Sequence, residues 1–393
     1  MTSEHKERSL FHTLYICGKI GARLHPIETI IGYAMVIPYF NSENTLICDW
    51  FVQNAIVQFL IFFPITIVPT WYTRHMFYVD IAWPCGVTAI GLQMMYFSTT
   101  VGTSATSFPG SFIYSYPFLV GLAIAVHGFR MAFGAIVLFF PYIYDTDIPR
   151  YEYAKLRFIQ ETNGAPYRAW SLKRTHDLCQ QYYANAVVLG VIGSLPVATL
   201  TSRMDSGDIF QPSLLSWAGL LIWVFAWIFE NKADLQKVRF MRKVKEGLTL
   251  RDKRLQDSSG KSKTYHVLGM PPFDGPEYSL WTRCRHPNYF GEWLAWVGLI
   301  ISVLPTLSYL HSIQAESSFQ IGCWATILLF IPRFFYDCLV YWTGAAPAEH
   351  FSHKKRGKVY EQYQQSTRVF FPFPMPFVNH AQRPGWSTLK SNA

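Results

Sequence analysis

The stretch LICDWFVQNAIVQFLIFFPITIVPTW, residues 46–71, decides the class of the fold. It is mostly apolar, and a helix needs roughly 20 apolar residues to cross the hydrocarbon core of a bilayer. Similar blocks follow at residues 78–101, 112–140, 182–200, 214–229, 291–311 and 321–342. An eighth stretch, 28–40, has only 13 residues, so a span and an interfacial or re-entrant segment both stay open for it.

The composition agrees with a membrane protein. Half of the 393 residues are hydrophobic and 15% are charged, whereas a soluble domain has about 25% charged residues. The surplus apolar surface must therefore face lipid. We predict an all-α, polytopic transmembrane bundle of seven or eight membrane helices.

The basic residues set the orientation of this bundle. If all eight segments cross, 31 of the 34 Lys and Arg residues fall in the loops of one side, whereas the other side holds only Arg203. The positive-inside rule makes the basic side cytosolic, together with both termini. The net charge of +9 then reflects orientation and attraction to anionic lipid headgroups rather than nucleic-acid binding.

The spans divide the chain into predicted regions. These are a cytosolic N-terminal segment (1–27), N-terminal transmembrane helices (28–140), a cytosolic loop (141–181), a C-terminal transmembrane domain that carries the site (182–375) and a cytosolic tail (376–393). The span at 214–229 should continue as a helix through Met241, before a polar run at 257–263. Turns are expected at Pro271-Pro272 and Gly275-Pro276.

Common soluble signatures are missing from the sequence. It contains no GxGxxG after a strand, no GxxxxGK[ST], no HExxH and no GxSxG. The seven cysteines form no CxxC pair, so we expect neither a disulfide framework nor a metal site. Any ligand must therefore be held by the membrane helices and the cytosolic loops.

The most informative motif is WTRCRHPNYFGEW, residues 281–293. Pro287 suits the first turn of a helix, and the positive end of that helix beside arginines and a histidine predicts a site for phosphate groups. Asn288 and Glu292 are one turn apart on the same face, and Gly291 permits a close approach of another backbone. The alternative is a headgroup anchor with a snorkelling Glu292, but a carboxylate just inside a span is costly without a partner.

A second cluster lies at 229–237, where Glu230 and Asp234 share a helix face and could accept ribose hydroxyls or pair with arginines. A charged helix end would look the same. Inside the apolar blocks, Arg130 indicates an internal polar site, whereas Arg333 has Asp337 at i+4 as a counter-charge.

A third cluster lies near the C-terminus. It comprises Glu349, His350, His353, the basic run Lys354-Lys355-Arg356, Tyr360 and Tyr363. Such a run is typical of a membrane anchor, and its histidines and tyrosines also suit a flap over a cofactor.

Taken in order, several stretches resemble the steroid 5α-reductase-like membrane proteins, a former group of unknown function related to sterol reductases. They are VDIAW (79–83), Arg130, DIPRY (147–151), Phe229-Glu230 with ADLQK (233–237), RHPNYFGE (285–292), YEQY (360–363) and Phe371-Pro372. The resemblance covers roughly residues 75–375, and RHPNYFGE is its most specific part.

The resemblance implies a reductase of the endoplasmic reticulum membrane that transfers hydride from NADPH to a carbon–carbon double bond of a lipid entering from the bilayer. The implied cofactor-binding residues are Arg130, Arg150, Glu230, Asp234, Lys237, Arg285, His286, Asn288, Tyr289, Glu292, His353, Tyr360 and Tyr363. Steroid 5α-reductases also use a Glu and a Tyr of their N-terminal half, and neither matches a position here. Asp80, His127 and Tyr151 are candidates for the proton donor by residue type only.

Two alternatives stay open. Isoprenylcysteine and phospholipid methyltransferases share an Arg-His-Pro-x-Tyr motif that binds S-adenosylmethionine, although they are usually shorter and residues 230–237 are closer to the reductases. A non-catalytic membrane scaffold would be expected to lose the polar cluster, which is intact here.

Overall fold

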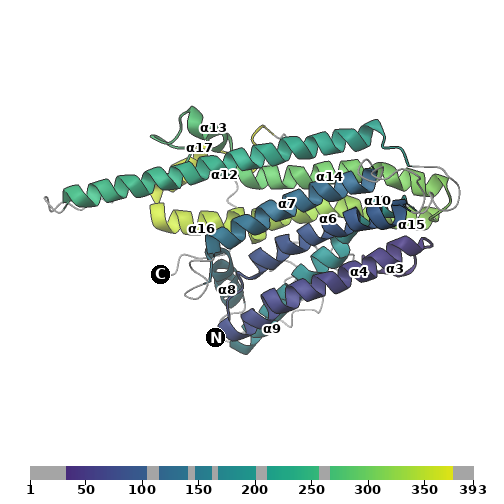
Figure 1. Cartoon of the computed structure of the whole chain (residues 1–393). Helices are drawn as coiled ribbons and strands as arrows, with labels where there is room; N and C mark the ends of the chain where they lie inside the picture. The colour runs from purple at the N-terminus through teal and green to yellow at the C-terminus, as the bar shows by residue number, and fades with distance from the viewer. Residues whose placement is uncertain are drawn as a thin grey trace, which may run out of the picture. The chain divides into compact units, whose positions relative to one another are not determined.

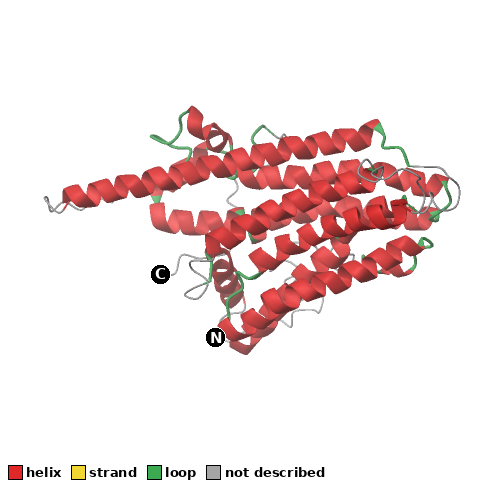
Figure 2. Ribbon diagram, viewed as in Figure 1, coloured by secondary structure: helices red, strands yellow, loops and turns green. Residues whose placement is uncertain are grey.

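The computed structural model describes residues 32–103, 115–139, 147–161, 167–200, 210–255 and 266–374. Within these ranges every regular element is a helix (Figure 2), and the one isolated β-bridge joins Cys284 to Arg368. Five helical stretches are long and apolar enough to cross a membrane: Thr45–Thr73, Tyr116–Val137, Leu214–Gly247, Pro287–Ser312 and Ser318–Arg356. The prediction of an all-α, multi-pass membrane protein is confirmed.

The chain forms two compact units, each assembled from two separate segments. Unit 1 consists of Met1–Trp223 and Trp296–Asp337, and unit 2 consists of Val224–Ala295 and Cys338–Ala393. Two long helices, α12 (Leu214–Leu255) and α14 (Pro287–Ser312), contribute residues to both units (Figure 1).

Unit 1 contains most of the N-terminal helices. They are α3 (Ile37–Phe40), α4 (Thr45–Phe62), the π-helical turn η1 (Phe63–Ile67), α5 (Val68–Thr73), α6 (Val79–Thr103), α7 (Tyr116–Phe139), α8 (Pro149–Glu161), α9 (Tyr167–Tyr183), the π-helical turn η4 (Ala184–Val188), α10 (Gly190–Ala198) and α15 (Ser318–Asp337). Helices α6 and α7 lie side by side (Figure 1). Gly91 permits their close contact, since a Cβ at this position would lie only 2.4 Å from the main-chain nitrogen of Ala125.

The helices match the apolar blocks, with three differences. The 28–40 stretch is interrupted by a turn at Met35–Val36 in its described part, so no single continuous helix crosses there. The predicted cytosolic loop 141–181 contains two helices, α8 and α9. The predicted span 182–200 is the end of a longer helix that runs from α9 through η4 into α10.

Two local expectations are confirmed. Arg333 donates from Nε to Asp337 Oδ2 at 2.7 Å, so the charge inside the last apolar block has the predicted counter-charge. Helix α12 continues past Met241 to Leu255, and turns lie at the predicted positions near Pro271 and Gly275. The polar run 257–263 lies outside the described residues.

Unit 2 contains the second part of α12, the first part of α14 and five short elements. These are the 3₁₀ turn η5 (Pro276–Tyr278), α13 (Ser279–Arg283), the π-helical turn η6 (Cys338–Trp342), α16 (Ala345–Arg356) and α17 (Lys358–Ser366). Its apolar contacts include Phe290 of α14, whose ring lies 5.7 Å from that of Phe229 and 6.0 Å from those of Phe370 and Phe371, measured between centroids. The Phe-Pro ending therefore packs on the start of α14.

We predict that Gly219→Val destabilises unit 1, because α12 and α14 touch there through backbone atoms. A Cβ on Gly219 would lie 2.2 Å from the nitrogen of Ser302 and 2.6 Å from the oxygen of Gly298. Forced separation of the helices should cost about 1–3 kcal/mol. Thermal denaturation of the purified protein in detergent would measure the loss. Gly322→Val is the matched control, since a Cβ at Gly322 meets nothing within 4 Å; equal melting temperatures for the two variants would contradict the contact.

Candidate functional site

The most buried charged group of the predicted site is Arg285, between α13 and α14. Its side chain is 1% exposed, and that of its partner Glu349 on α16 is 0% exposed. Arg285 Nε donates to Glu349 Oε1 at 2.7 Å, and Nη2 donates to Oε2 at 3.2 Å. Two parallel N–H···O bonds are the strong form of an arginine–carboxylate pair. The pair is a joint between two segments that are distant in sequence.

The same guanidinium holds α17 and the chain after it. Arg285 Nη1 donates to the main-chain oxygens of Gln364, at 3.0 Å, and Thr367. The main-chain nitrogen of Arg285 donates to Arg368 O at 2.7 Å, and Gln364 Nε2 donates to Glu349 Oε2 at 2.8 Å. Four of the five N–H donors of the guanidinium are thus engaged. Direct cofactor binding by Arg285 stays a prediction, and at most one N–H group of the guanidinium is left for it.

His286 contacts the same Glu349 carboxylate and positions the residues that follow it. Its Nε2 lies 3.0 Å from Glu349 Oε1, and the residue is 5% exposed. Burial lowers the pKa of His286, while the hydrogen bond to Glu349 acts in the opposite direction. The imidazole ring stacks on Tyr289 with 5.2 Å between centroids and 10° between planes. His286 therefore fixes the first turn of α14, which begins at Pro287 as predicted.

Helices α12 and α14 meet within unit 2 at Gly291. A Cβ there would lie 2.7 Å from Glu230 Cβ and 2.9 Å from its Cα, which confirms the predicted close approach. Carboxylate oxygens of Glu230 and Glu292 lie within 4.8 Å of each other, and the two residues are 5% and 7% exposed. The contact therefore places two buried carboxylates side by side.

One turn nearer the start of α14, Asn288 faces Asp234. Its Nδ2 donates to Asp234 Oδ1 at 3.1 Å. Because only the amide nitrogen can donate to a carboxylate, the orientation of the carboxamide is fixed. The buried Oδ1 of Asn288 then has no hydrogen-bond partner among the described residues. A buried acceptor in this state marks a place for a donor supplied from outside the chain.

Helix α13 supports this face of α12. Trp281 Nε1 donates to Ala233 O at 3.0 Å, and the main-chain nitrogen of Leu280 donates to Gln236 Oε1 at 3.3 Å. Lys237 Nζ lies 5.9 Å from the centre of the Trp281 ring, within range of a cation–π contact. Lys237 therefore places a positive charge one turn beyond Asp234.

The C-terminal tyrosines are internal groups of unit 2. Tyr363 Oη donates to Trp281 O at 2.5 Å, and Tyr360 is 5% exposed. Burial raises the pKa of both phenols. His353 Nε2 lies 2.7 Å from Glu361 Oε1. These contacts dock α17 firmly, and cofactor contact by Tyr360, Tyr363 or His353 stays a prediction.

The three candidates for the proton donor lie in unit 1, where two of them meet. Tyr151 Oη donates to Asp80 Oδ1 at 3.0 Å, and Arg150 Nη1 donates to the same oxygen at 3.2 Å. His127 lies on α7, fully buried and edge-on to Trp296 with 5.5 Å between ring centroids. Arg130 lies one turn further along α7. Roles of these five side chains in catalysis or cofactor binding stay predictions.

Asp147 explains why the start of α8 lies against the start of α6. Its carboxylate accepts from the main-chain nitrogens of Met76 at 2.8 Å and Phe77 at 3.1 Å. Burial raises the pKa of Asp147, and the three backbone donors, those of Met76, Ile148 and Phe77, act in the opposite direction. Within unit 1, the DIPRY stretch therefore links the start of α8 to the start of α6.

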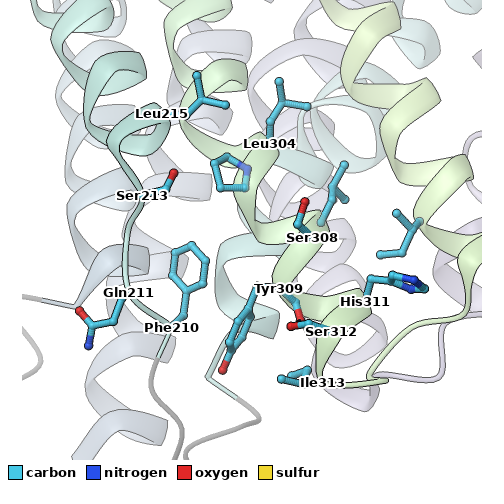
Figure 3. Close-up of a pocket in the computed structure, with 13 residues that line it drawn as sticks. Phe210, Gln211, Ser213, Leu215, Leu304, Ser308, Tyr309, His311, Ser312 and Ile313 are labelled. Carbon is cyan, nitrogen blue, oxygen red and sulfur yellow. The ribbon is translucent and has the colours of Figure 1, made fainter.

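Unit 1 also contains a cavity of about 1180 Å³ (Figure 3). The beginning of α12, the end of α14 and Ile321 of α15 line it, together with Phe210 and Gln211. Its polar groups are hydroxyl, amide and imidazole groups, without any Lys, Arg, Asp or Glu. None of the predicted site residues lines it, so this cavity is not the candidate cofactor site.

A multi-pass helical membrane protein with a buried polar cluster at the start of one span is the class that the fold and the site define. Residues 62–367 match the model of DUF1295, a protein family of unknown function, and the chain belongs to this family. Neither the curated proteins nor the solved structures contain a significant match.

The sequence did not reveal the partner of Arg285. Glu349 is 64 residues away and lies in the basic C-terminal segment that suggested an anchor or a flap. The sequence contains one indication that Glu349 is buried: it lies before the basic run, at the end of the apolar stretch Gly344-Ala-Ala-Pro-Ala-Glu349. An acidic residue in such surroundings needs a buried cation, and the RHPNYFGE motif contains one.

We predict that Glu349→Ala strongly destabilises unit 2, because it leaves the Arg285 guanidinium buried without its counter-charge. Removing one partner of a buried pair costs about 3–5 kcal/mol. Denaturation of Glu349→Ala, Arg285→Met and the double variant Arg285→Met/Glu349→Ala would give the coupling between the two side chains. The double variant should melt above Glu349→Ala.

Glu277→Gln is the control for this cycle. Glu277 pairs with Lys243 at 2.7 Å on the surface, where its side chain is 59% exposed. Loss of an exposed pair should leave the melting temperature unchanged. If Glu349→Ala behaved like Glu277→Gln, the Arg285–Glu349 pair would not be the joint described above.

Proposed function

We propose that this protein is a membrane reductase that takes hydride from NADPH and adds it to a carbon–carbon double bond of a lipid, in the manner of the steroid 5α-reductase-like proteins that its motifs resemble. The observation that carries the proposal is the Asp234–Asn288 contact with its unpartnered Asn288 Oδ1. It offers one acceptor for an N–H or O–H donor and a carboxylate beside it. The proposed setting is the endoplasmic reticulum membrane.

The acceptor oxygens of this site fit the sugar and amide parts of the cofactor. Ribose hydroxyls and a nicotinamide carboxamide carry O–H and N–H donors, which the oxygens of Asp234, Asn288 and Glu292 can accept. When bound, NADPH would supply the hydride. The residues of the chain would bind and orient it, and Glu230 and Glu292 are shielded from bulk water.

The phosphate groups require a different part of the site. The first turn of α14 was expected to take them, but Asp234 at this turn would repel an anion. Lys237, held over Trp281, offers positive charge one turn away on α12. We therefore place the phosphates toward Lys237 and the ribose at Asp234 and Asn288.

One observation also favours a second candidate, an S-adenosylmethionine-dependent methyltransferase. Asp234, Glu230 and Glu292 bring three carboxylates to one part of unit 2. S-adenosylmethionine carries a cationic sulfonium and a cationic amino group, and carboxylates suit both. NADPH is favoured here because the 230–237 stretch resembles the reductases more closely.

We predict that Asn288→Ala weakens NADPH binding about 5- to 100-fold, since it removes a buried acceptor and leaves Asp234 without its amide donor. Titration of full-length protein in nanodiscs with NADPH, followed by the fluorescence of the cofactor, would measure the affinity. Asn231→Ala is the matched control on α12, because the Asn231 amide donates to Trp227 O of its own helix, at 2.7 Å, and to no other described residue.

The same samples should be titrated with S-adenosylmethionine. Binding of NADPH alone, lost in Asn288→Ala and kept in Asn231→Ala, supports the reductase. Binding of S-adenosylmethionine alone supports the methyltransferase, and binding of neither overturns both proposals in favour of a scaffold. Equal NADPH affinity in the two variants would remove Asn288 from the site.

A further inference from the structure

Four side-chain carboxamides form a buried cluster within unit 1. They are Asn54 and Gln58 of α4, Gln93 of α6 and Asn185 of the π-helical turn η4, and we call them the carboxamide cluster. Asn54, Gln58 and Asn185 are 0% exposed. All four lie in predicted membrane spans, where a polar side chain is costly and is a candidate functional group by default.

Every amide nitrogen of the carboxamide cluster donates two hydrogen bonds. Asn54 donates to the main-chain oxygens of Asn185 and Ala186, at 3.3 and 3.1 Å. Gln58 donates to Asn54 Oδ1 at 3.1 Å and to Gly86 O at 2.9 Å. These contacts fill the donor capacity of both amides.

The amide nitrogens of the other two residues also donate two hydrogen bonds each. Gln93 donates to Asn54 Oδ1 at 3.3 Å and to Ala89 O at 3.2 Å. Asn185 donates to Gln58 Oε1 at 3.2 Å and to Trp83 O at 2.9 Å. Since each of these nitrogens faces only oxygens, exchanging O and N in either amide would set oxygen against oxygen.

Two acceptors of the carboxamide cluster are left over. Asn185 Oδ1 and Gln93 Oε1 are buried and have no hydrogen-bond partner among the described residues. A buried oxygen without a donor costs free energy that the native protein normally avoids. With all donors used and two acceptors open, the cluster can take an O–H or N–H group and has nothing to offer a carbonyl, an ether or an anion.

The face of α6 that carries Gln93 also carries exposed apolar side chains. Gln93 is only partly buried, and its neighbours Leu92 and Tyr96 are 54% and 61% exposed, as expected for a face toward acyl chains. The opposite side is closed, because a Cβ on Gly86 would lie 2.2 Å from Gln58 Oε1 and 2.3 Å from Asn185 Nδ2. The two open acceptors are themselves buried, so a hydroxyl group from the bilayer reaches them only when side chains on this face of α6 move.

We propose that the carboxamide cluster binds the hydroxyl group of a membrane lipid, which donates its hydrogen to Asn185 Oδ1 or to Gln93 Oε1. In the bilayer interior the donors that come with lipid are hydroxyl groups, of sterols or of fatty alcohols. The site lies wholly in unit 1 and does not depend on the reductase activity proposed for unit 2. A water molecule is the other O–H donor of this chemistry, and the experiment separates the two.

The test compares each alcohol with its methyl ether, which cannot donate. Full-length protein in dioleoylphosphatidylcholine nanodiscs is titrated with cholesterol or cholesteryl methyl ether, and with oleyl alcohol or oleyl methyl ether, and thermal denaturation is followed. At least one alcohol should bind about tenfold more tightly than its ether. Equal binding within both pairs would show that water fills the acceptors, and would overturn the proposal.

Gln93→Met or Asn185→Leu should remove the preference for the alcohol, because each variant lacks one of the two amide oxygens. Ser98→Ala is the matched control on α6, since within the described part of the chain the buried Ser98 hydroxyl donates to Met94 O of its own helix alone, at 2.8 Å. A preference that persists in both variants, or that disappears in Ser98→Ala, would also overturn the proposal. Gln93→Met carries the decision if Asn185→Leu does not fold.

Discussion

The buried ion pair of Arg285 and Glu349 is the constraint on which the arrangement of unit 2 depends. The charges of both side chains are withdrawn from water, so they are tolerable only because each oxygen of Glu349 and four N–H groups of Arg285 are hydrogen-bonded. Those bonds reach α16, α17 and the chain that follows. They also fix the residue that precedes the start of α14, and hence the direction in which Asn288 and Glu292 point.

At the carboxamide cluster, unit 1 pairs most of its buried polar groups without charge. The carboxamide cluster and the π-helical turn η4 exchange hydrogen bonds between side chains and main-chain oxygens, which a membrane interior requires because it offers no water. A π-helical turn leaves its carbonyls available to such donors, and these turns are common at functional sites. Neutral amides cost less to bury than ions, so this solution suits the middle of a span, whereas the ion pair lies next to a helix start.

The sequence predicted those features that depend on short-range chemistry. Long apolar blocks located α4, α6, α7 and α14, Pro287 marked the start of α14, and the spacing of Arg333 and Asp337 predicted their contact. Gly291 predicted a close helix contact, although its partner, Glu230, comes from the tertiary structure. The Arg285–Glu349 pair and the carboxamide cluster join residues separated by 64 and up to 131 positions. No periodicity or spacing in a single sequence encodes such pairs, so they could not be predicted.

The charged side chains of the site restrict the chemistry of its ligand more than the motif alone does. RHPNYFGE resembles a phosphate site when read as sequence, because two of its residues are basic. Once Arg285 is neutralised by Glu349, and burial lowers the pKa of His286, neither supplies net positive charge to a ligand. Three carboxylates also lie beside α14, those of Asp234, Glu230 and Glu292, and each has further interactions within the protein. A ligand that presents hydroxyl, amide or cationic groups to α14 and its anionic groups to Lys237 would match these side chains, and a phosphate group at the helix start stays a prediction.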